Sequence, residues 1–306
     1  MQPTLKDLSP PQSLSRDTFW MSLPAIISSF AIPCLAFPYL IRWLEDFVTV
    51  DANTLGEIAS KFGPGVAILY GTFVSITLSL LYQRQEDIQD LAAKESSQLA
   101  TTTRNLMTLF KEENELAIKA GQCIADQIRT FSSTSRGEEL LLIMSDDPYL
   151  RIMGLVEELE DKWIDPVPGE TLRMRPDLLN GVRESVEKLV KLRASRLSHE
   201  ALSLPPTHFF ILTSLTFLIL LGYSIHILPS VTFNAAGAAV PSPESCFLFG
   251  LLSAVYVLFY NSACDLNEPF GGIYQIRRST TACHFLEAKQ FIMNHPLLKG
   301  NIHYYD

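Results

Sequence analysis

Charged residues are missing from four long stretches of this 306-residue sequence. No Asp, Glu, Lys or Arg occurs in residues 18–41, 62–83, 201–243 or 245–264. A helix of about 20 apolar residues spans the ~30 Å hydrocarbon core of a bilayer, and each stretch reaches that length. Backbone polar groups in lipid must be satisfied within the segment, so each stretch is expected to be helical. The alternative, four buried helices of a large soluble protein, fits four stretches of this length poorly.

Sequence motifs of enzymes are also missing. There is no P-loop, GxSxG, HExxH or dinucleotide glycine fingerprint. The six histidines are scattered, and the five cysteines show no close pairing that would suggest a zinc ribbon or a disulfide framework. We therefore expect no catalytic residues, no metal site and no cofactor, and we do not expect an enzyme. The net charge of −9 argues against a nucleic-acid-binding protein.

Most of the charge lies between the second and third uncharged stretches. Residues 84–200 hold 16 of the 24 Lys and Arg residues and 22 of the 33 Asp and Glu residues. Within residues 84–130 apolar residues recur at helical spacing and proline is absent, which predicts one long helix that continues from the second span. Asp147 and Pro148 have the residue types of a helix N-cap and first position. Further helices are predicted over 138–145, 148–163 and 177–203.

These patterns predict an all-α integral membrane protein with four transmembrane helices. A bundle of long helices is inserted between spans two and three. The prolines at 24, 33 and 38 predict that the first helix is kinked or broken, or that its first part lies at the interface. The expected segments are an N-terminal tail (1–17), spans one and two (18–83), a helical domain (84–204), spans three and four (205–264) and a C-terminal segment (265–306).

Lysine and arginine residues near the span ends predict the orientation. The 229–244 loop contains neither residue type, and the 42–61 loop has two basic residues against four acidic ones. The opposite side is richer in basic residues, so both termini and residues 84–204 are expected on the cytosolic side, or on the stromal side in a plastid. The juxtamembrane basic residues of that side include Arg193, Arg196, Arg277 and Arg278.

Span two contains hydroxyl residues at helical spacing. Thr72, Ser75 and Ser79 fall on one face, where their hydroxyls could help an anion to pass without a fixed charge. Close helix packing through small residues is the alternative explanation. Because no span contains Asp, Glu, Lys or Arg, the sequence argues against a proton-coupled pump or a cation-coordinating carrier.

A distinctive motif follows the last span. Its adjacent glycines permit a tight turn, its proline restricts the approach, and its phenylalanine offers an apolar anchor. The motif is interpreted either as a turn packed against the bundle or as a clasp for a ligand or ion. Its candidate residues are Asp265, Glu268, Pro269, Phe270, Gly271 and Gly272.

This motif resembles the Asp-x-x-x-Pro-Phe-x-Gly signature of the plastid and cyanobacterial bestrophin-like membrane proteins. The resemblance extends to Arg193-x-x-Arg196 before span three and to the Gly71-Thr72 span that runs into Gln83-Arg84-Gln85-Glu86. It covers about residues 60–295 and is strongest over 193–276. More remotely, Glu268-Pro269-Phe270-Gly271 is similar to the Asn-Pro-Phe-Gly of true bestrophins, which are pentameric chloride channels with four spans per subunit.

The resemblance implies a homo-oligomer in a lipid bilayer that passes chloride or bicarbonate through a pore lined by span two. The phenylalanine-lined neck of animal bestrophins is not evident in span two, where only Phe73 lies near the middle. In animal members an aspartate run after the motif forms a calcium clasp. That run is absent here, so calcium gating is not expected. The implied location is a thylakoid, plastid-envelope or cyanobacterial membrane.

A different function is also compatible with the sequence. The protein would be a non-conducting scaffold or assembly factor of a photosynthetic membrane complex. Its long middle helices would then bind a thylakoid protein partner.

Overall fold

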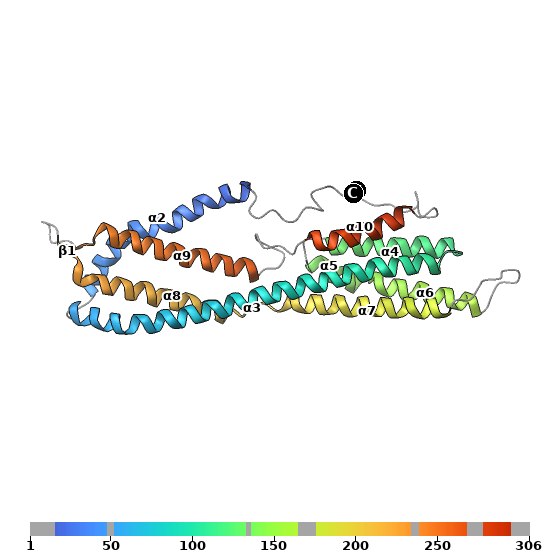
Figure 1. Ribbon diagram of the computed structural model, residues 1–306, viewed down its shortest axis with the longest axis horizontal. Helices are drawn as coiled ribbons and strands as arrows, with labels where there is room; N and C mark the ends of the chain where they lie inside the picture. Colours follow the sequence, from blue (N-terminus) through green and yellow to red (C-terminus); the bar gives the residue numbers. More distant parts are fainter. Residues whose placement is uncertain are drawn as a thin grey trace. The chain divides into compact units, whose positions relative to one another are not determined.

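The computed structural model describes residues 16–47, 52–132, 136–164, 176–233, 239–267 and 278–294, and these are almost entirely helical (Figure 1). Four helices are long enough and apolar enough to cross a membrane, which confirms the prediction of four apolar helices. They are α2 (Arg16–Phe47), α3 (Ala52–Leu109), α8 (Pro206–Ile227) and α9 (Pro243–Asn267).

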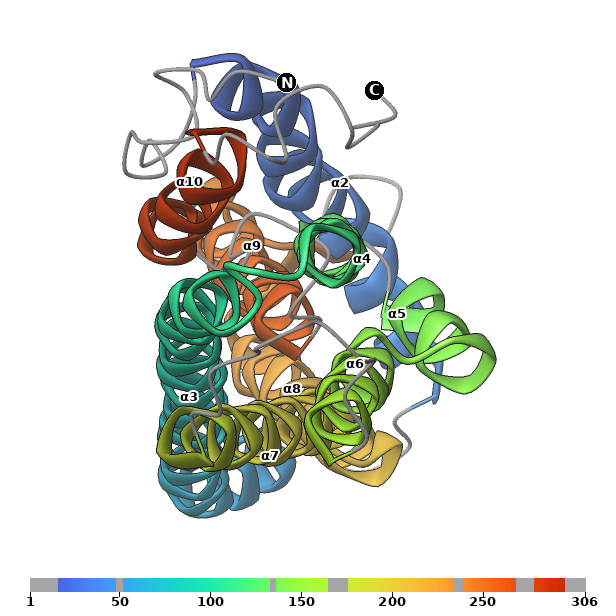
Figure 2. The same ribbon diagram turned by 90° about the vertical axis from the view of Figure 1, so that its right-hand side faces the viewer.

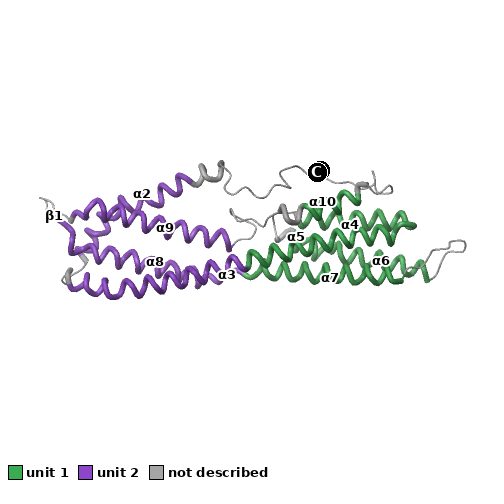
Figure 3. The backbone as a smooth tube through the Cα atoms, viewed as in Figure 1, with its two compact units in different colours: residues 1–12, 84–202, 275–306 green, residues 13–83, 203–274 purple. Residues whose placement is uncertain are grey.

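The described chain forms two compact units, which are coloured separately in Figure 3. Of the described residues, those within 84–202 and 278–294 form unit 1, and those within 16–83 and 203–267 form unit 2. Helix α3 contributes residues to both units, as expected from a sequence without a helix breaker at the end of span two.

The prolines of α2 do not break the helix. Pro24, Pro33 and Pro38 all lie inside α2, which runs without interruption to Phe47. A break was one of the predicted outcomes, and it is wrong for the described residues. In a membrane, an open break would leave backbone groups without partners, so a continuous helix that loses only the proline N–H groups is less costly.

Helices α2 and α9 pack tightly in unit 2. The rings of Phe37 and Phe249 stack with their centroids 4.4 Å apart, and Ile41 completes their buried cluster. Gly250 lies at the closest approach: a Cβ atom there would be 2.9 Å from both the Cβ of Cys34 and the backbone oxygen of Phe30. The absence of a side chain at Gly250 therefore allows the two helices to meet.

The core of unit 1 is built by its long helices. Helix α6 (Pro148–Ile164) packs against both α4 (Asn114–Ser132) and α7 (Pro176–Ala201), as Figure 2 shows. Their apolar faces share one buried cluster with the second half of α3. Two further helices complete the unit, namely α5 (Arg136–Ser145) and α10 (Arg278–Asn294).

The single helix predicted over 84–130 is wrong. Helix α3 ends at Leu109, a short turn follows, and α4 begins at Asn114. Phe110 is fully buried in the turn, and the N–H of Glu113 donates to its carbonyl oxygen at 3.0 Å. The turn lets the apolar residues on both sides enter one core. The predicted helices after it agree with α5, α6 and α7 to within two residues at each end.

A small hairpin was not predicted. A 3-10 turn (Leu228–Ser230) follows α8, and strands β1 (Thr232–Phe233) and β2 (Ala239–Val240) then pair in antiparallel register. Two-residue strands are too short to produce a readable alternation of apolar and polar residues.

The close approach of α2 and α9 can be tested by substitution. Gly250→Ala is expected to destabilise the protein by about 1–3 kcal/mol, because the new methyl group meets backbone that cannot move aside. Gly222→Ala on α8 is the matched control, because a Cβ atom there meets nothing within 4 Å. Thermal unfolding in detergent measures both. Equal midpoints for the two variants would contradict the close packing at Gly250.

Candidate functional site

The hydroxyl face of α3 is exposed on the described chain. Thr72, Ser75 and Ser79 are all exposed, so the helices of unit 2 do not bury this face. The hydroxyl of Thr72 donates to the carbonyl oxygen of Ile68 at 2.9 Å. Such a bond satisfies the hydroxyl proton within the helix and leaves the oxygen lone pairs and the face itself available. The outward-facing apolar neighbours Ile68 and Ile76 are also exposed.

Phe73 does not join that face. Its half-buried ring stacks on the imidazole of His208 on α8, with centroids 4.4 Å apart and planes 23° from parallel. Thr77 is fully buried beside it, and its hydroxyl lies 2.6 Å from Nε2 of His208 and 2.6 Å from the carbonyl oxygen of Phe73. If the Thr77 hydroxyl donates to that carbonyl, the Nε2–H of His208 donates to the Thr77 oxygen.

The Thr77–His208 pair was not anticipated from the sequence. The available signal was that His208 is a polar residue near the start of an apolar span, where a buried polar side chain needs a partner. Its partner is 131 residues away in the chain and could not be identified by spacing. The pair joins α3 to α8 on the side of α3 that is buried within unit 2.

Only the beginning of the post-membrane motif is described. Asp265 is half-buried on α9, and Leu266 is buried with Leu81 and Ala263. The side-chain oxygen of Asn267 accepts a hydrogen bond from the backbone N–H of Leu204 at 2.9 Å. The other motif residues and one of the basic residues lie outside the described part of the chain: Glu268, Pro269, Phe270, Gly271, Gly272 and Arg277. Arg278 begins α10, and its side chain is also outside it.

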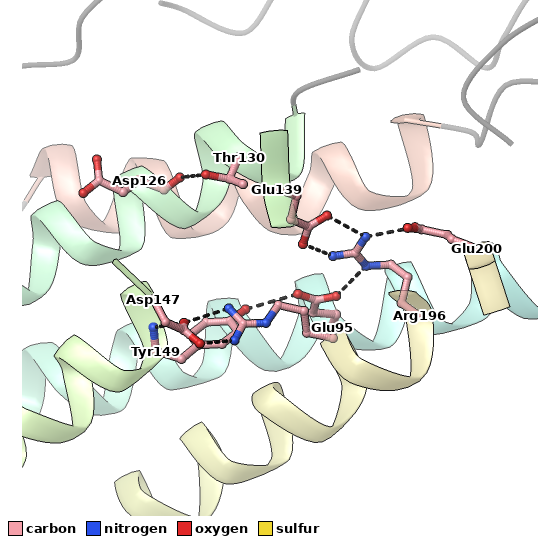
Figure 4. Close-up of polar contacts among 9 residues, drawn as sticks. Glu95, Asp126, Thr130, Glu139, Asp147, Tyr149, Arg196 and Glu200 are labelled. Carbon is pink, nitrogen blue, oxygen red and sulfur yellow. Dashed lines mark hydrogen bonds and ion pairs between the residues drawn. The ribbon is translucent and has the colours of Figure 1, made fainter. Parts of the chain in front are cut away.

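Arg196 is the centre of a buried cluster of carboxyl groups in unit 1 (Figure 4). Its Nε donates to Glu95 on α3 at 2.8 Å, and two of its nitrogens contact the Glu139 carboxylate on α5 at 2.5 and 3.0 Å. Its Nη1 also donates to Glu200 on α7 at 2.9 Å. One guanidinium group thus connects three helices. Among the described residues, no group of three or more His, Cys, Asp or Glu side chains is arranged to hold a metal ion.

Arg193 lies one turn before Arg196 and is also buried. It forms a bidentate pair with Asp147, with Nη1 2.9 Å from Oδ1, and its guanidinium lies 4.5 Å from the ring centroid of Tyr149. Asp147 also accepts the N–H of Tyr149 at 2.9 Å, which confirms its predicted role as the N-cap of α6. The sequence indicated two basic residues near a span end but not their burial.

Burial changes the acid–base properties of this cluster. Loss of hydration raises the pKa of the Glu95 carboxyl, and the Glu139 carboxylate raises it further, while Arg196 and Arg193 act in the opposite direction. Burial also raises the pKa of Tyr149, whose hydroxyl lies 3.3 Å from Oε1 of Glu95. Glu95 therefore binds a proton more tightly in the folded protein than in solution.

Comparison with known proteins identifies the fold. The family model of the Bestrophin-like domain matches residues 32–281. A solved structure of a bacterial bestrophin homologue from Klebsiella pneumoniae is similar, with a TM-score of 0.60 and 13% identity over 89% of this chain and 100% of that chain. A structure of that homologue with a point mutation has a TM-score of 0.59 and 12% identity, over 87% and 98% of the two chains. At these identities the likeness establishes the fold alone. No curated protein matches this chain.

The role of Arg196 is open to a direct test. Arg196→Gln would leave three buried carboxyl groups without their guanidinium and is expected to destabilise the protein by about 3–5 kcal/mol. Arg183→Gln is the matched control, because the ion pair of Arg183 with Glu160 on the neighbouring α6 is partly exposed and is worth about 0–1 kcal/mol. Chemical unfolding followed by circular dichroism measures both. A similar loss for the two variants would refute the central role of Arg196.

Proposed function

The chain belongs to the bestrophin-like family, and on this premise we propose that it is an oligomeric channel that passes chloride or bicarbonate down a gradient. Several identical subunits would surround an axis, and α3 of each subunit would line the pore. The observation that carries this proposal is the exposed row of Thr72, Ser75 and Ser79 in the uncharged part of α3, residues 62–83.

The hydroxyl row is suited to weak contacts with an anion. Hydroxyl dipoles can replace part of the hydration shell of an ion without binding it so tightly that it cannot leave. A fixed charge in a span commonly marks ion-coupled transport, and residues 62–83 contain none. The combination favours a passive pore. The exposed side chains of Ile68 and Ile76 would alternate with the hydroxyl groups along it.

The same proposal includes a topology of four spans with the helical domain, residues 84–204, between spans two and three. Both termini and this domain would lie on the cytosolic or stromal side, because the 229–244 loop has no Lys or Arg. Residues 42–61, the end of α2 and the start of α3, add little positive charge to the opposite side, since Lys61 is paired with Glu57 one turn earlier on α3 at 2.6 Å. The membrane would be that of a plastid or a cyanobacterium, as the sequence motifs suggest.

A non-conducting scaffold is the second candidate. The observation that favours it is on α5, where Leu141 and Met144 are exposed although α5 belongs to the charged unit 1. Apolar side chains in such positions can contact a protein partner. A scaffold needs no exposed hydroxyl row on α3. The two functions are therefore distinguished by whether ions pass along α3.

The pore can be tested with a substitution that preserves shape. Thr72→Val removes a hydroxyl group and is expected to lower chloride flux into liposomes by about 2- to 10-fold, the equivalent of one hydrogen bond of about 0.5–1.5 kcal/mol. Thr213→Val on α8 is the matched control, since Thr213 is also exposed and its hydroxyl also donates to the carbonyl four residues earlier, at 2.8 Å. It should leave the flux unchanged.

The wild-type protein gives the more severe test of the same proposal. Vesicles containing it should release chloride or bicarbonate faster than empty vesicles. If neither anion passes, with or without calcium, the channel is excluded and the scaffold is favoured.

A further inference from the structure

Cys34 lies on the side of α2 that faces α9. It is about one turn after Phe30 and one turn before Phe37 on the same helix. The ring of Phe30 meets that of Phe247 on α9 with centroids 5.3 Å apart, and the ring of Phe37 stacks on that of Phe249. The side chain of Cys34 is therefore flanked by two contacts that both reach the first two turns of α9.

Cys246 lies at the matching place on α9. It packs against the buried apolar cluster that α2 and α9 share. It is one turn before Gly250, where a Cβ atom would be 2.9 Å from the Cβ of Cys34. The two thiol groups are close enough to interact electrostatically. The cysteines thus belong to different helices and face each other beside the contact at Gly250.

The spacing of the two backbones suits a disulfide bond. Such a bond needs Cα atoms about 4.4–6.8 Å apart. One turn of α9, about 5.4 Å, separates Cys246 from the residue that meets Cys34. Pro33 and Pro38 lie on either side of Cys34 and remove two backbone hydrogen bonds from this part of α2. This part of α2 can therefore adjust by the small distance that a bond to Cys246 requires.

The other described cysteines differ from this pair. Cys264 lies about five turns further along α9, so it is out of reach of Cys34. In unit 1, Cys123 is fully buried and Cys283 is exposed. Cys34 and Cys246 are both free thiols and both half-buried, so a small uncharged oxidant can reach them.

We propose that Cys34 and Cys246 are a redox modification site, at which hydrogen peroxide produces a reversible disulfide bond that joins α2 to α9. The thiolate of one cysteine attacks the peroxide, so that an S–O bond forms, the O–O bond breaks and one water leaves. The second thiolate attacks this sulfur, so that the S–S bond forms, the S–O bond breaks and a second water leaves. The two cysteines lose two electrons in total, and the peroxide gains them.

The bond would change how the two helices are held together. With free thiols, α2 and α9 are joined by packing alone at this contact. The disulfide closes a loop of more than 200 residues and so restricts the unfolded chain strongly. A dithiol would restore the free thiols by exchange. The proposal concerns unit 2 alone and does not depend on ion conduction.

Peroxide treatment of the full-length protein in lipid nanodiscs tests the proposal. Digestion without reductant should give a peptide pair that links Cys34 to Cys246 and is lighter by two hydrogen atoms, and dithiothreitol should separate the pair. The thermal unfolding midpoint should rise by about 5–10 °C on oxidation and return on reduction. Oxidation of the exposed Cys283 shows in the same sample that the oxidant is active.

Two variants locate the effect. Cys246→Ser should show neither the linked peptides nor the rise in the midpoint. The matched control carries Cys246→Ser together with Leu248→Cys, which moves the thiol to an exposed position of α9, and it should not form the link either.

Three results would overturn the proposal. These are the absence of linked peptides from the wild type although Cys283 is oxidised, equal linkage when the thiol is moved to position 248, and a linked protein that unfolds at the same temperature as the reduced one. The first and third results come from the wild type, so they hold even if a variant does not fold.

Discussion

In a bilayer, a backbone N–H or C=O group without a partner has no water to bind, and unit 2 is organised by this constraint. Its four apolar helices satisfy most of their own backbone groups, and α2 stays helical through three prolines at the cost of the bonds that the proline N–H groups would make. Side-chain hydroxyls follow the same rule, as Thr72, Thr213 and Ser224 donate to the carbonyl four residues earlier. These helices then pack through close contact rather than through charged groups. Gly250 allows such a contact between α9 and α2 because it has no side chain.

Unit 1 differs from unit 2, because it buries charged residues, and each of these needs a partner of opposite charge within the folded core. An apolar cluster forms its core, and the ion pairs of Arg193 and Arg196 join the helices around it. A buried ion pair adds little net stability relative to apolar residues, but removing one partner is costly. The cluster is therefore a determinant of the arrangement of α3, α5, α6 and α7 more than a source of stability.

The sequence predicted the features that depend on local patterns. Uncharged stretches indicated the four apolar helices, and Asp147-Pro148 indicated the start of α6. The turn at Phe110 was missed because no glycine or proline marks it. The chain turns there because Phe110 is buried in the core, which the sequence does not reveal. The partners of Arg196 are as far as 101 residues away, and those of His208 lie on another span, so no spacing rule identifies them. The motif residues after Asn267 remain predictions.

The proposed pore depends on the hydroxyl face of α3, which unit 2 leaves exposed to a neighbouring subunit or an anion. The most direct measurement is the current through a planar bilayer that contains a Ser75→Cys variant, while an anionic, membrane-impermeant thiol reagent is added. If α3 lines an anion pore, the reagent blocks the current in the variant and leaves the parent protein unaffected. A variant current that persists unchanged, or a parent protein that carries no anion current, would contradict the account.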